Sequence, residues 1–293
     1  MSQVQAVRKQ QHHEITYLIE ETRDLVSPPQ VHFALLEVLN DPISTTDDMA
    51  EVIAMDPALT ARLLRIVNSP YYGLVRRIDT ISRAVTVIGS NELFNLAVAV
   101  AATAVFSRLP GSLVNMDCFW RHSVFAAMVS RELAKRANVL HPERLFVGGL
   151  LHDVGSLLLY NERPDTMSDL LLVAQGDEEV MFHAELHRLG FSHAEVGEGI
   201  LSLWQLPETL CIAIGAHHTP LDTQGPCPEA GILYLADHLA NRSERSGFAA
   251  ESRPNGELDE AVLKLLGIGK KDLIPAVEAA TVQFDQSIAM FLP

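Results

Sequence analysis

The spacing of hydrophobic residues along the chain is typical of helices. Apolar side chains recur three and four positions apart, whereas the alternating runs of Val, Ile, Thr and aromatic residues that mark strands hardly occur. In residues 31–39 the apolar positions 31, 35, 38 and 39 share one helical face, and Asn40-Asp41-Pro42 ends this helix. We therefore expect an all-α protein.

Capping residues and prolines divide the first part of the chain into short helices. Thr46-Asp47-Asp48 and Asp56-Pro57 are start signals for helices over residues 48–55 and 58–68. Two further helices are expected over residues 82–88 and 90–106, hinged at Gly89. The second is so rich in Ala and Val that it should be buried on all sides.

Leu109-Pro110-Gly111-Ser112 interrupts two strongly helical stretches and predicts a boundary near residue 110. Beyond it we expect helices over residues 119–137, 144–160, 168–189, 192–204, 207–217 and 229–242, and two terminal helices. The predicted organisation is a helical extension over 1–26, an N-terminal multi-helix subdomain over 27–109, a helical bundle over 110–242, and C-terminal helices over 243–293 that pack on the bundle. The last helix carries apolar residues at 284, 288, 291 and 292, which would cover the bundle or another subunit.

Composition narrows the class of protein. With 293 residues, of which 48% are hydrophobic, the chain can bury a substantial core. The longest nearly uncharged stretch, residues 96–106, is too short to span a bilayer, so we expect no membrane segment. The N-terminus lacks the apolar core of a secretory signal, which predicts a cytoplasmic protein. Cys118, Cys211 and Cys227 form no CxxC pair, which argues against a disulfide framework or a thiolate zinc site.

Charge argues against general nucleic-acid binding. The formal net charge is −15, and the 22 Lys and Arg residues are dispersed, whereas phosphate neutralisation needs a clustered positive surface. One group of arginines in the first half is the exception, although helices commonly carry such residues as a solvated face or as ion-pair partners: Arg62, Arg65, Arg76, Arg77 and Arg83. Nucleic-acid binding is therefore the weakest of the hypotheses.

Histidine changes the picture, because most of the 12 histidines lie in the second half of the chain. Neutral imidazoles and carboxylates on several helices can bind Fe, Mn, Zn, Ni or Co. A lone histidine in a helix is more often a hydrogen-bonded core or surface residue, but an ordered set in apolar surroundings argues for a metal site, because buried polar groups are costly unless they are paired or metal-bound. The candidates are His122, the pair His152-Asp153 within the apolar run 147–159, His193, the doublet His217-His218, and Asp237 within the apolar run 230–237.

The order of these residues resembles the HD superfamily of metal-dependent phosphohydrolases, in which a His precedes an HDxG motif and a distal Asp follows. His193 and His217-His218 resemble the two-metal branch, which includes the HD-GYP cyclic-dinucleotide phosphodiesterases. From about residue 25 to 285 the chain resembles an HDOD protein, a regulatory relative of these enzymes whose C-terminal part is an HD-domain-like bundle. The motifs are Pro28-Pro29, Leu39-Asn40-Asp41-Pro42, Met55-Asp56-Pro57-Ala58-Leu59-Thr60, Val67-Asn68-Ser69-Pro70-Tyr71-Tyr72-Gly73, Ile81-Ser82-Arg83-Ala84, Gly149-Leu150-Leu151-His152-Asp153-Val154-Gly155, His193-Ala194-Glu195-Val196-Gly197 and Trp204-Gln205-Leu206-Pro207.

The resemblance implies a site for one or two divalent transition-metal ions, with Fe or Mn favoured and Zn, Ni or Co also suited. One ion would take His122, His152, Asp153 and Asp237; the other would take His193, His217 and His218, with Asp153 bridging. In an active hydrolase, such a pair of ions activates a water at the bridging carboxylate. Glu195, Glu198 and Asp117 are available to orient the imidazoles, and His183 and His187 are possible substitutes for His193.

The sequence differs from the active phosphodiesterases at two places, and these differences bear on whether the protein is an enzyme. Gly155 is followed by Ser156 instead of the lysine that suits a substrate phosphate, and no Gly-Tyr-Pro segment follows His217-His218, which argues against cyclic di-GMP hydrolysis. The resemblance therefore favours a bacterial regulatory module that binds a signalling protein partner or a ligand, with any metal retained structurally or as a sensor. The alternative is a metal-dependent phosphohydrolase that acts on a nucleotide or another small phosphoester.

Overall fold

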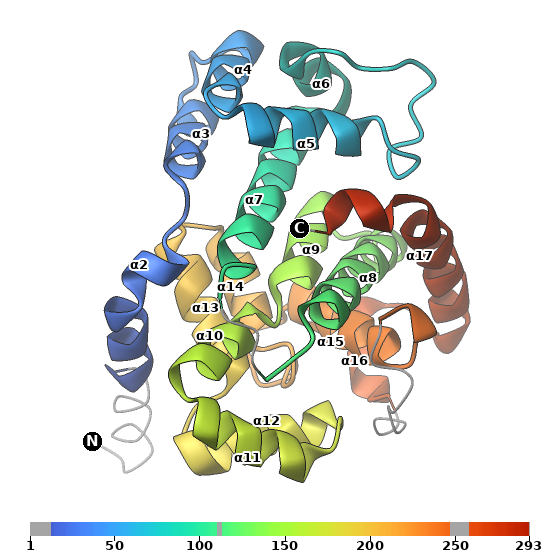
Figure 1. The fold of residues 1–293 in the computed structure, drawn as a ribbon. Coiled ribbons are helices and arrows are strands. Elements are labelled where there is room, and N and C mark those ends of the chain that lie inside the picture. Colours follow the sequence, from blue (N-terminus) through green and yellow to red (C-terminus); the bar gives the residue numbers. More distant parts are fainter. Residues whose placement is uncertain (1–12, 110–112, 247–257, 293) are drawn as a thin grey trace.

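A computed structural model of the chain describes residues 13–109, 113–246 and 258–292 (Figure 1). In these ranges all regular secondary structure is helical and no strand occurs, which confirms the predicted all-α class. The first described helix covers residues 13–21 and is followed by α2 (Arg23–Val26). Part of the predicted extension, residues 1–12, lies outside the described residues.

Four short helices form the upper part of the molecule in Figure 1: α3 (Gln30–Asn40), α4 (Thr46–Ala54), α5 (Pro57–Val67) and α6 (Ile81–Ile88). Their starts follow from capping side chains. Thr45 and Asp48 form a reciprocal capping box at α4, and Asp56 accepts hydrogen bonds from the first backbone amides of α5, where Pro57 needs no acceptor. The predicted short helices are confirmed, and the longest connection among them covers residues 68–80, between α5 and α6.

The next helix, α7 (Ser90–Phe106), connects this upper part to the rest of the molecule. Gly89 separates it from α6 with a φ of 91°, a backbone conformation that favours glycine. Almost every residue from Leu93 to Thr103 is buried, because α7 packs against α3, α5 and α6 on one side and against a helix of the lower bundle on the other. The prediction that this helix is buried all round is confirmed.

Among the described residues, no single helix is both long enough and apolar enough to cross a membrane. Helices α6 and α7 together meet the length and composition criteria for a span. Their axes, however, bend by 118° at the break between them.

The lower bundle is built around α8 (Met116–Arg136), which packs against several of its neighbours along its length. The other helices are α9 (Pro142–Leu151), α10 (Val154–Glu162), α11 (Pro164–Ala174), α12 (Glu178–Leu189), α13 (His193–Leu203), α14 (Glu208–Gly215), α15 (Pro228–Asn241), α16 (Glu260–Leu266) and α17 (Lys270–Phe291), with a short 3₁₀ turn at Glu244–Ser246. Helix α17 packs along α8, with Phe284 and Phe291 buried. The apolar face of the last helix therefore covers this chain's own bundle.

Two of the predicted long helices are each broken in the structure. The stretch 144–160 is divided into α9 and α10 at His152-Asp153, where the Asp153 backbone leaves helical geometry. The stretch 168–189 is divided into α11 and α12, because Gln175 and Gly176 adopt positive φ and the Asp177 side chain caps α12. The sequence Gln175-Gly176-Asp177 is typical of a helix end followed by a new start, so the break between α11 and α12 could have been predicted. The break between α9 and α10 could not, because the apolar periodicity continues across it.

Specific contacts hold the upper helices against the bundle. The Trp204 indole donates a 2.7 Å hydrogen bond to the Val26 carbonyl, and His32 Nε2 donates to the Trp204 carbonyl over 2.6 Å. On the opposite side, the Arg131 guanidinium lies 4.5 Å from the centre of the Tyr71 ring. Arg62, one of the arginines grouped in the sequence, donates to the carbonyls of Phe291 and Leu292. These contacts fix how the two halves of the chain meet.

A close approach between α10 and α13 depends on Gly155. A Cβ at this position would lie 2.0 Å from the His193 carbonyl oxygen and 2.7 Å from the Gly197 amide nitrogen. Both are backbone atoms, so no side chain can move aside to relieve the overlap. The glycine of the HDxG motif is thus required because it lets the start of α10 touch the backbone that carries His193.

We predict that Gly155→Ala lowers the free energy of unfolding by about 2–3 kcal/mol, because the overlap outweighs the roughly 1 kcal/mol by which alanine favours a helix. Urea unfolding followed by circular dichroism measures the change. Gly225→Ala is the matched control, since a Cβ there has no neighbour within 4 Å. Equal stability of the two variants would contradict the proposed close packing.

Candidate metal centre

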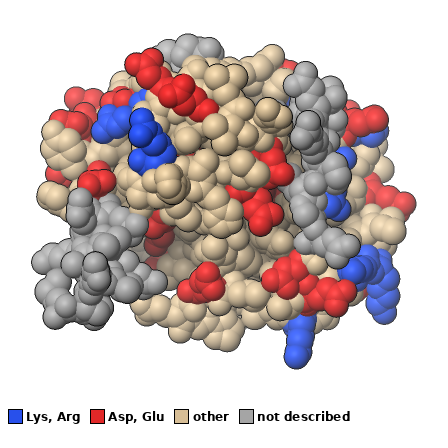
Figure 2. All heavy atoms as spheres, turned by 90° about the horizontal axis from the view of Figure 1, so that it is seen from below, with Lys and Arg blue, Asp and Glu red and all other residues tan. Residues whose placement is uncertain are grey.

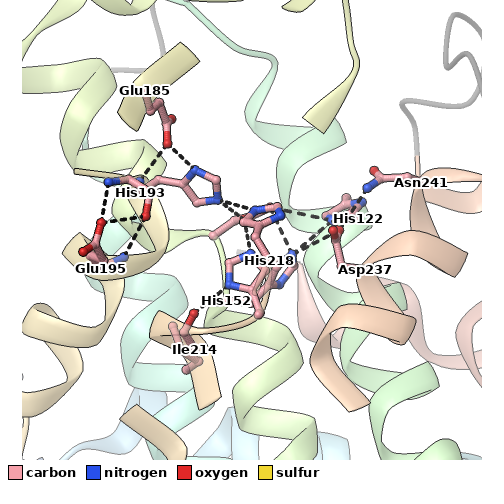
Figure 3. Close-up of polar contacts among 12 residues, drawn as sticks. His122, His152, Glu185, His193, Glu195, Ile214, His218, Asp237 and Asn241 are labelled. Carbon is pink, nitrogen blue, oxygen red and sulfur yellow. Dashed lines mark hydrogen bonds and ion pairs between the residues drawn. The ribbon is translucent and has the colours of Figure 1, made fainter. Parts of the chain in front are cut away.

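The structure brings together all seven candidate ligands, which come from segments far apart in the sequence (Figure 3). Helix α8 contributes one side chain, the break between α9 and α10 contributes two, the first residue of α13 one, the segment after α14 two, and α15 one. In chain order they are His122, His152, Asp153, His193, His217, His218 and Asp237. They form two adjacent groups, each of which could hold a metal ion.

The first group places four potential donor atoms around one point. His122 Nε2 lies 3.1 Å from Asp237 Oδ1, 3.3 Å from His152 Nε2 and 3.7 Å from Asp153 Oδ2. His152 Nε2 lies 3.0 Å from Asp153 Oδ2 and 3.5 Å from Asp237 Oδ1. For metal–ligand bonds of about 2.1 Å, adjacent ligands are about 3.0 Å apart in an octahedron and about 3.4 Å apart in a tetrahedron, so the observed separations suit a transition metal.

The second group consists of His193, His217 and His218 and lies on the other side of Asp153. His193 Nε2 is 3.0 Å from His218 Nε2. The other carboxylate oxygen of Asp153, Oδ1, lies 3.3 Å from His193 Nε2 and 3.7 Å from His217 Nε2. Each oxygen of Asp153 therefore faces a different group, which is the geometry of a carboxylate that can bridge two ions.

Acceptors behind the imidazoles orient three of these rings. His152 Nδ1 donates to the Gly149 carbonyl over 2.8 Å, and His217 Nδ1 donates to the Ile214 carbonyl over 2.7 Å. His193 Nδ1 donates to the Glu185 carboxylate over 2.7 Å. Because Nδ1 donates in each ring, Nε2 points into the cluster, where it can ligate a metal once it carries no proton.

The pKa values of several clustered histidines shift in opposite directions. Burial alone would lower the pKa of His152, but the adjacent Asp153 carboxylate outweighs it, so the pKa lies well above the ordinary value. The His193 pKa is raised against burial by Glu185 and Asp153. Burial lowers the pKa of His217 to about 4, and the positive field of His152 reinforces this shift. Metal binding would therefore have to displace protons from some ligands, while others are already neutral.

The chemistry of the donors fits a cation. His217 Nε2 is buried and has no hydrogen-bond partner among the described residues, which is costly unless the nitrogen meets a ligand. Two pairs of rings approach through Nε2, His122 with His152 at 3.3 Å and His193 with His218 at 3.0 Å. A metal ion in each group could be ligated by both nitrogens of the pair.

A carboxylate that the sequence did not single out orients one of the imidazoles. Glu195 caps α13 by accepting from Ser192, Asp117 is exposed at the start of α8, and Glu198 faces Gly215 on another side of the helix. Glu185 on α12 instead accepts from both the ring and the backbone amide of His193. No local pattern reveals this, because the contact depends on how α12 packs against α13.

The possible substitutes for His193 lie outside the cluster. His183 and His187 are exposed on α12, and neither belongs to a group that could hold a metal. Asn241 lies one turn after Asp237 on α15 and donates a 3.0 Å hydrogen bond to Asp237 Oδ1. Residues four apart on a helix lie on the same face, so the sequence alone could have predicted that Asn241 contacts Asp237.

Two cavities reach the cluster. One, of about 390 Å³, is strongly acidic, and its lining includes Glu178, Glu179, Asp222, Asp237 and Asp259. The other, of about 220 Å³, is mainly apolar and reaches Asp153 and His193 beside Ser156. No Lys or Arg lines either cavity among the described residues. Figure 2 faces this side of the molecule and shows acidic side chains spread over it, with few basic ones near its centre.

Solved structures of similar proteins share this fold. A protein from Shewanella amazonensis SB2B, described as a "Putative phosphohydrolase", is 28% identical with a TM-score of 0.72, and the match covers 94% of this chain and 98% of that one. An HDOD domain protein of unknown function from Geobacter sulfurreducens is 25% identical with a TM-score of 0.67, covering 96% of each chain.

Sequence comparisons agree. An uncharacterized protein from Treponema pallidum (strain Nichols) is 27% identical over 195 residues, which is 65% of this chain but only 37% of that protein. The chain thus matches little more than a third of that relative's length. The HDOD domain family model matches residues 25–220, which include six of the seven clustered side chains and the helices that position them. The chain therefore belongs to the HDOD family.

Proposed function

We propose that the protein is a regulatory HDOD module that acts through protein or ligand binding and retains an HD-type site for one or two divalent transition-metal ions. One observation carries this proposal: a complete set of His and Asp donors lies beside cavities that no described Lys or Arg lines. The mixed nitrogen and oxygen donors favour Fe or Mn, and Zn, Ni or Co would also suit them. When bound, an ion supplies concentrated positive charge and Lewis acidity at the Asp153 carboxylate.

The charge around the site supports binding over phosphoester hydrolysis. A phosphate that approaches the centre would pass the carboxylates of the larger cavity, which repel it. Ser156, which follows Gly155, is buried and offers a hydroxyl where the related hydrolases carry a cation. The metal ions alone would have to attract the substrate.

The cluster suits a regulatory role because it ties together separate segments. Ligation would fix α8, the α9–α10 break, the start of α13, the end of α14 and α15 relative to one another. The far end of α13 leads to Trp204, whose contacts with Val26 and His32 hold the upper helices. Occupancy of the centre would thus stabilise the arrangement that a signalling partner meets, by the coupling of metal binding to folding.

The second candidate is a metal-dependent phosphohydrolase that acts on a nucleotide or another small phosphoester. The position of Asp153 favours it, since one oxygen faces each group as two-metal hydrolysis requires. In that case the apolar cavity beside Ser156 would hold the non-phosphate part of the substrate.

We predict that the protein loaded with Mn²⁺ and then desalted retains about two ions per chain, one for each group. Loading should raise the midpoint of thermal unfolding by about 5 °C, because the ions bind the folded state alone. His152→Ala should lose most of the metal, and His193→Ala should lose one ion. Elemental analysis and calorimetry measure these changes.

His187→Ala is the matched control, since His187 lies exposed on α12, and it should keep the wild-type metal content. The loaded protein should not hydrolyse p-nitrophenyl phosphate or a cyclic dinucleotide. Hydrolysis that His152→Ala abolishes would instead establish the phosphohydrolase. Absence of bound metal in the wild-type protein would contradict the metal centre altogether.

We also predict that Glu185→Gln lowers the affinity for the second ion by about tenfold, because the carboxylate increases the basicity of the His193 ring that it orients. Titration with Mn²⁺ followed by electron paramagnetic resonance gives the two affinities. Glu195→Gln is the control: it weakens a helix cap beside the same histidine and should leave both affinities within about twofold. Equal losses in the two variants would show that Glu185 has no special role.

A further inference from the structure

Helix α12 presents two carboxylates to the metal centre. Glu178 and Glu185 are seven residues apart, which is nearly two full turns, so they lie on the same face of the helix. The residues between them on this face, Met181 and Phe182, are buried, and Phe182 stacks on His218 at 4.8 Å between ring centres. Glu185 reaches His193 in the second group. The other carboxylate, Glu178 at the first residue of α12, lines a cavity together with Asp237 of the first group.

Glu178 lies between the two cavities that reach the cluster, and it is the residue that their linings share. On one side it lines the acidic cavity with Asp237, and on the other it lines the apolar cavity with Asp153. Its Oε2 atom is inaccessible to solvent and has no hydrogen-bond partner among the described residues. The Glu178 carboxyl therefore covers the cluster from the side on which both cavities open.

The Glu178 carboxyl meets carboxylates of the first group, and Asp237 lies within hydrogen-bond reach of it. With Asp153, three carboxyl groups thus meet beside cavities that no described Lys or Arg lines. An arrangement of this kind is expected where a cation binds, since a buried charge is costly unless it is paired or coordinates a metal.

The first group also leaves coordination positions open. It supplies four donors, His122, His152, Asp153 and Asp237, whereas Fe²⁺ and Mn²⁺ in nitrogen and oxygen sites commonly take six. In a hydrolase the open positions receive water and substrate. Here Glu178 offers a further carboxylate on the side where both cavities open.

We propose that Glu178 is a further ligand of the ion held by the first group and that it closes this site from the α12 side. The inference rests on the proposed metal centre and goes beyond it, because it makes α12 a lid whose position depends on metal occupancy. A lid ligated in this way takes up a position that a substrate would need, so the centre holds its ion without presenting it for hydrolysis. The metal then acts as the element that orders α12.

The test compares Glu178→Ala with Glu179→Ala in the full-length protein, with Mn²⁺ alone as the probe. Glu179 is the next residue, is exposed and lines the same acidic cavity, so its removal changes the local charge equally without removing the proposed ligand. We expect Glu178→Ala to weaken Mn²⁺ binding at the first site by at least about tenfold, while Glu179→Ala changes it by less than about threefold. Glu178→Gln should fall between the two, since an amide oxygen is a weaker ligand.

Water proton relaxation of the bound Mn²⁺ gives the second readout. Replacement of the carboxylate by water should increase the relaxation enhancement per bound ion in Glu178→Ala and leave it unchanged in Glu179→Ala. The metal-free variant should unfold at a temperature no lower than the wild type, because an unpaired buried carboxyl has been removed. A purely structural role of Glu178 would instead lower the metal-free stability.

The outcomes separate this inference from the function on which it rests. If the wild type binds Mn²⁺ and Glu178→Ala matches it in affinity and relaxation, Glu178 is no ligand and the inference is overturned while the metal centre stands. If the wild type binds no divalent ion, both fail. Loss of affinity in Glu178→Ala without a rise in relaxation enhancement also overturns the proposed ligand.

Discussion

The position of the Asp153 carboxylate governs the centre. One of its oxygens lies 3.0 Å from His152 and the other 3.3 Å from His193, so this single side chain joins the two groups. It reaches this position because the backbone leaves helical geometry between α9 and α10. Two residues later, Gly155 allows α10 to touch the backbone of α13. The break and the glycine together bring the two groups within reach of one carboxylate.

Burial of the clustered histidines and aspartates costs folding free energy, which other interactions must offset. Without a cation, the raised pKa of His152 and the lowered pKa of His217 mean that neighbouring imidazoles carry different charge, stabilised by carboxylates at close range. A buried charged pair gains little net stability, because desolvation offsets most of its attraction. A divalent ion would stabilise the cluster more than these charged pairs do, since it would bind several of the donor atoms at once. On the proposed function, the stability of the bundle would be coupled to a bound ion.

The same features that favour a metal disfavour turnover. Phosphoryl chemistry needs positive charge both at the reacting atoms and along the approach, whereas the described residues around the approach are acidic or apolar. Glu185 on α12 supports His193, and we propose that Glu178 on the same helix closes the centre. A centre built in this way can report metal or hold a shape for a partner. The contacts of Trp204 provide a physical route from α13 to the upper helices.

The sequence by itself determined the helical class, most helix boundaries and the ligand candidates, because these depend on local signals such as Asp56-Pro57 or on the order of residue types. It did not determine the break at His152-Asp153, since the apolar periodicity continues across it. Nor did it identify Glu185, whose contact with His193 depends on the packing of α12 against α13, or Glu178, which we propose as a further ligand. The sequence specified which side chains could bind a metal. Only the tertiary structure decided which carboxylates support and cover them, because those contacts are set by the distances between helices.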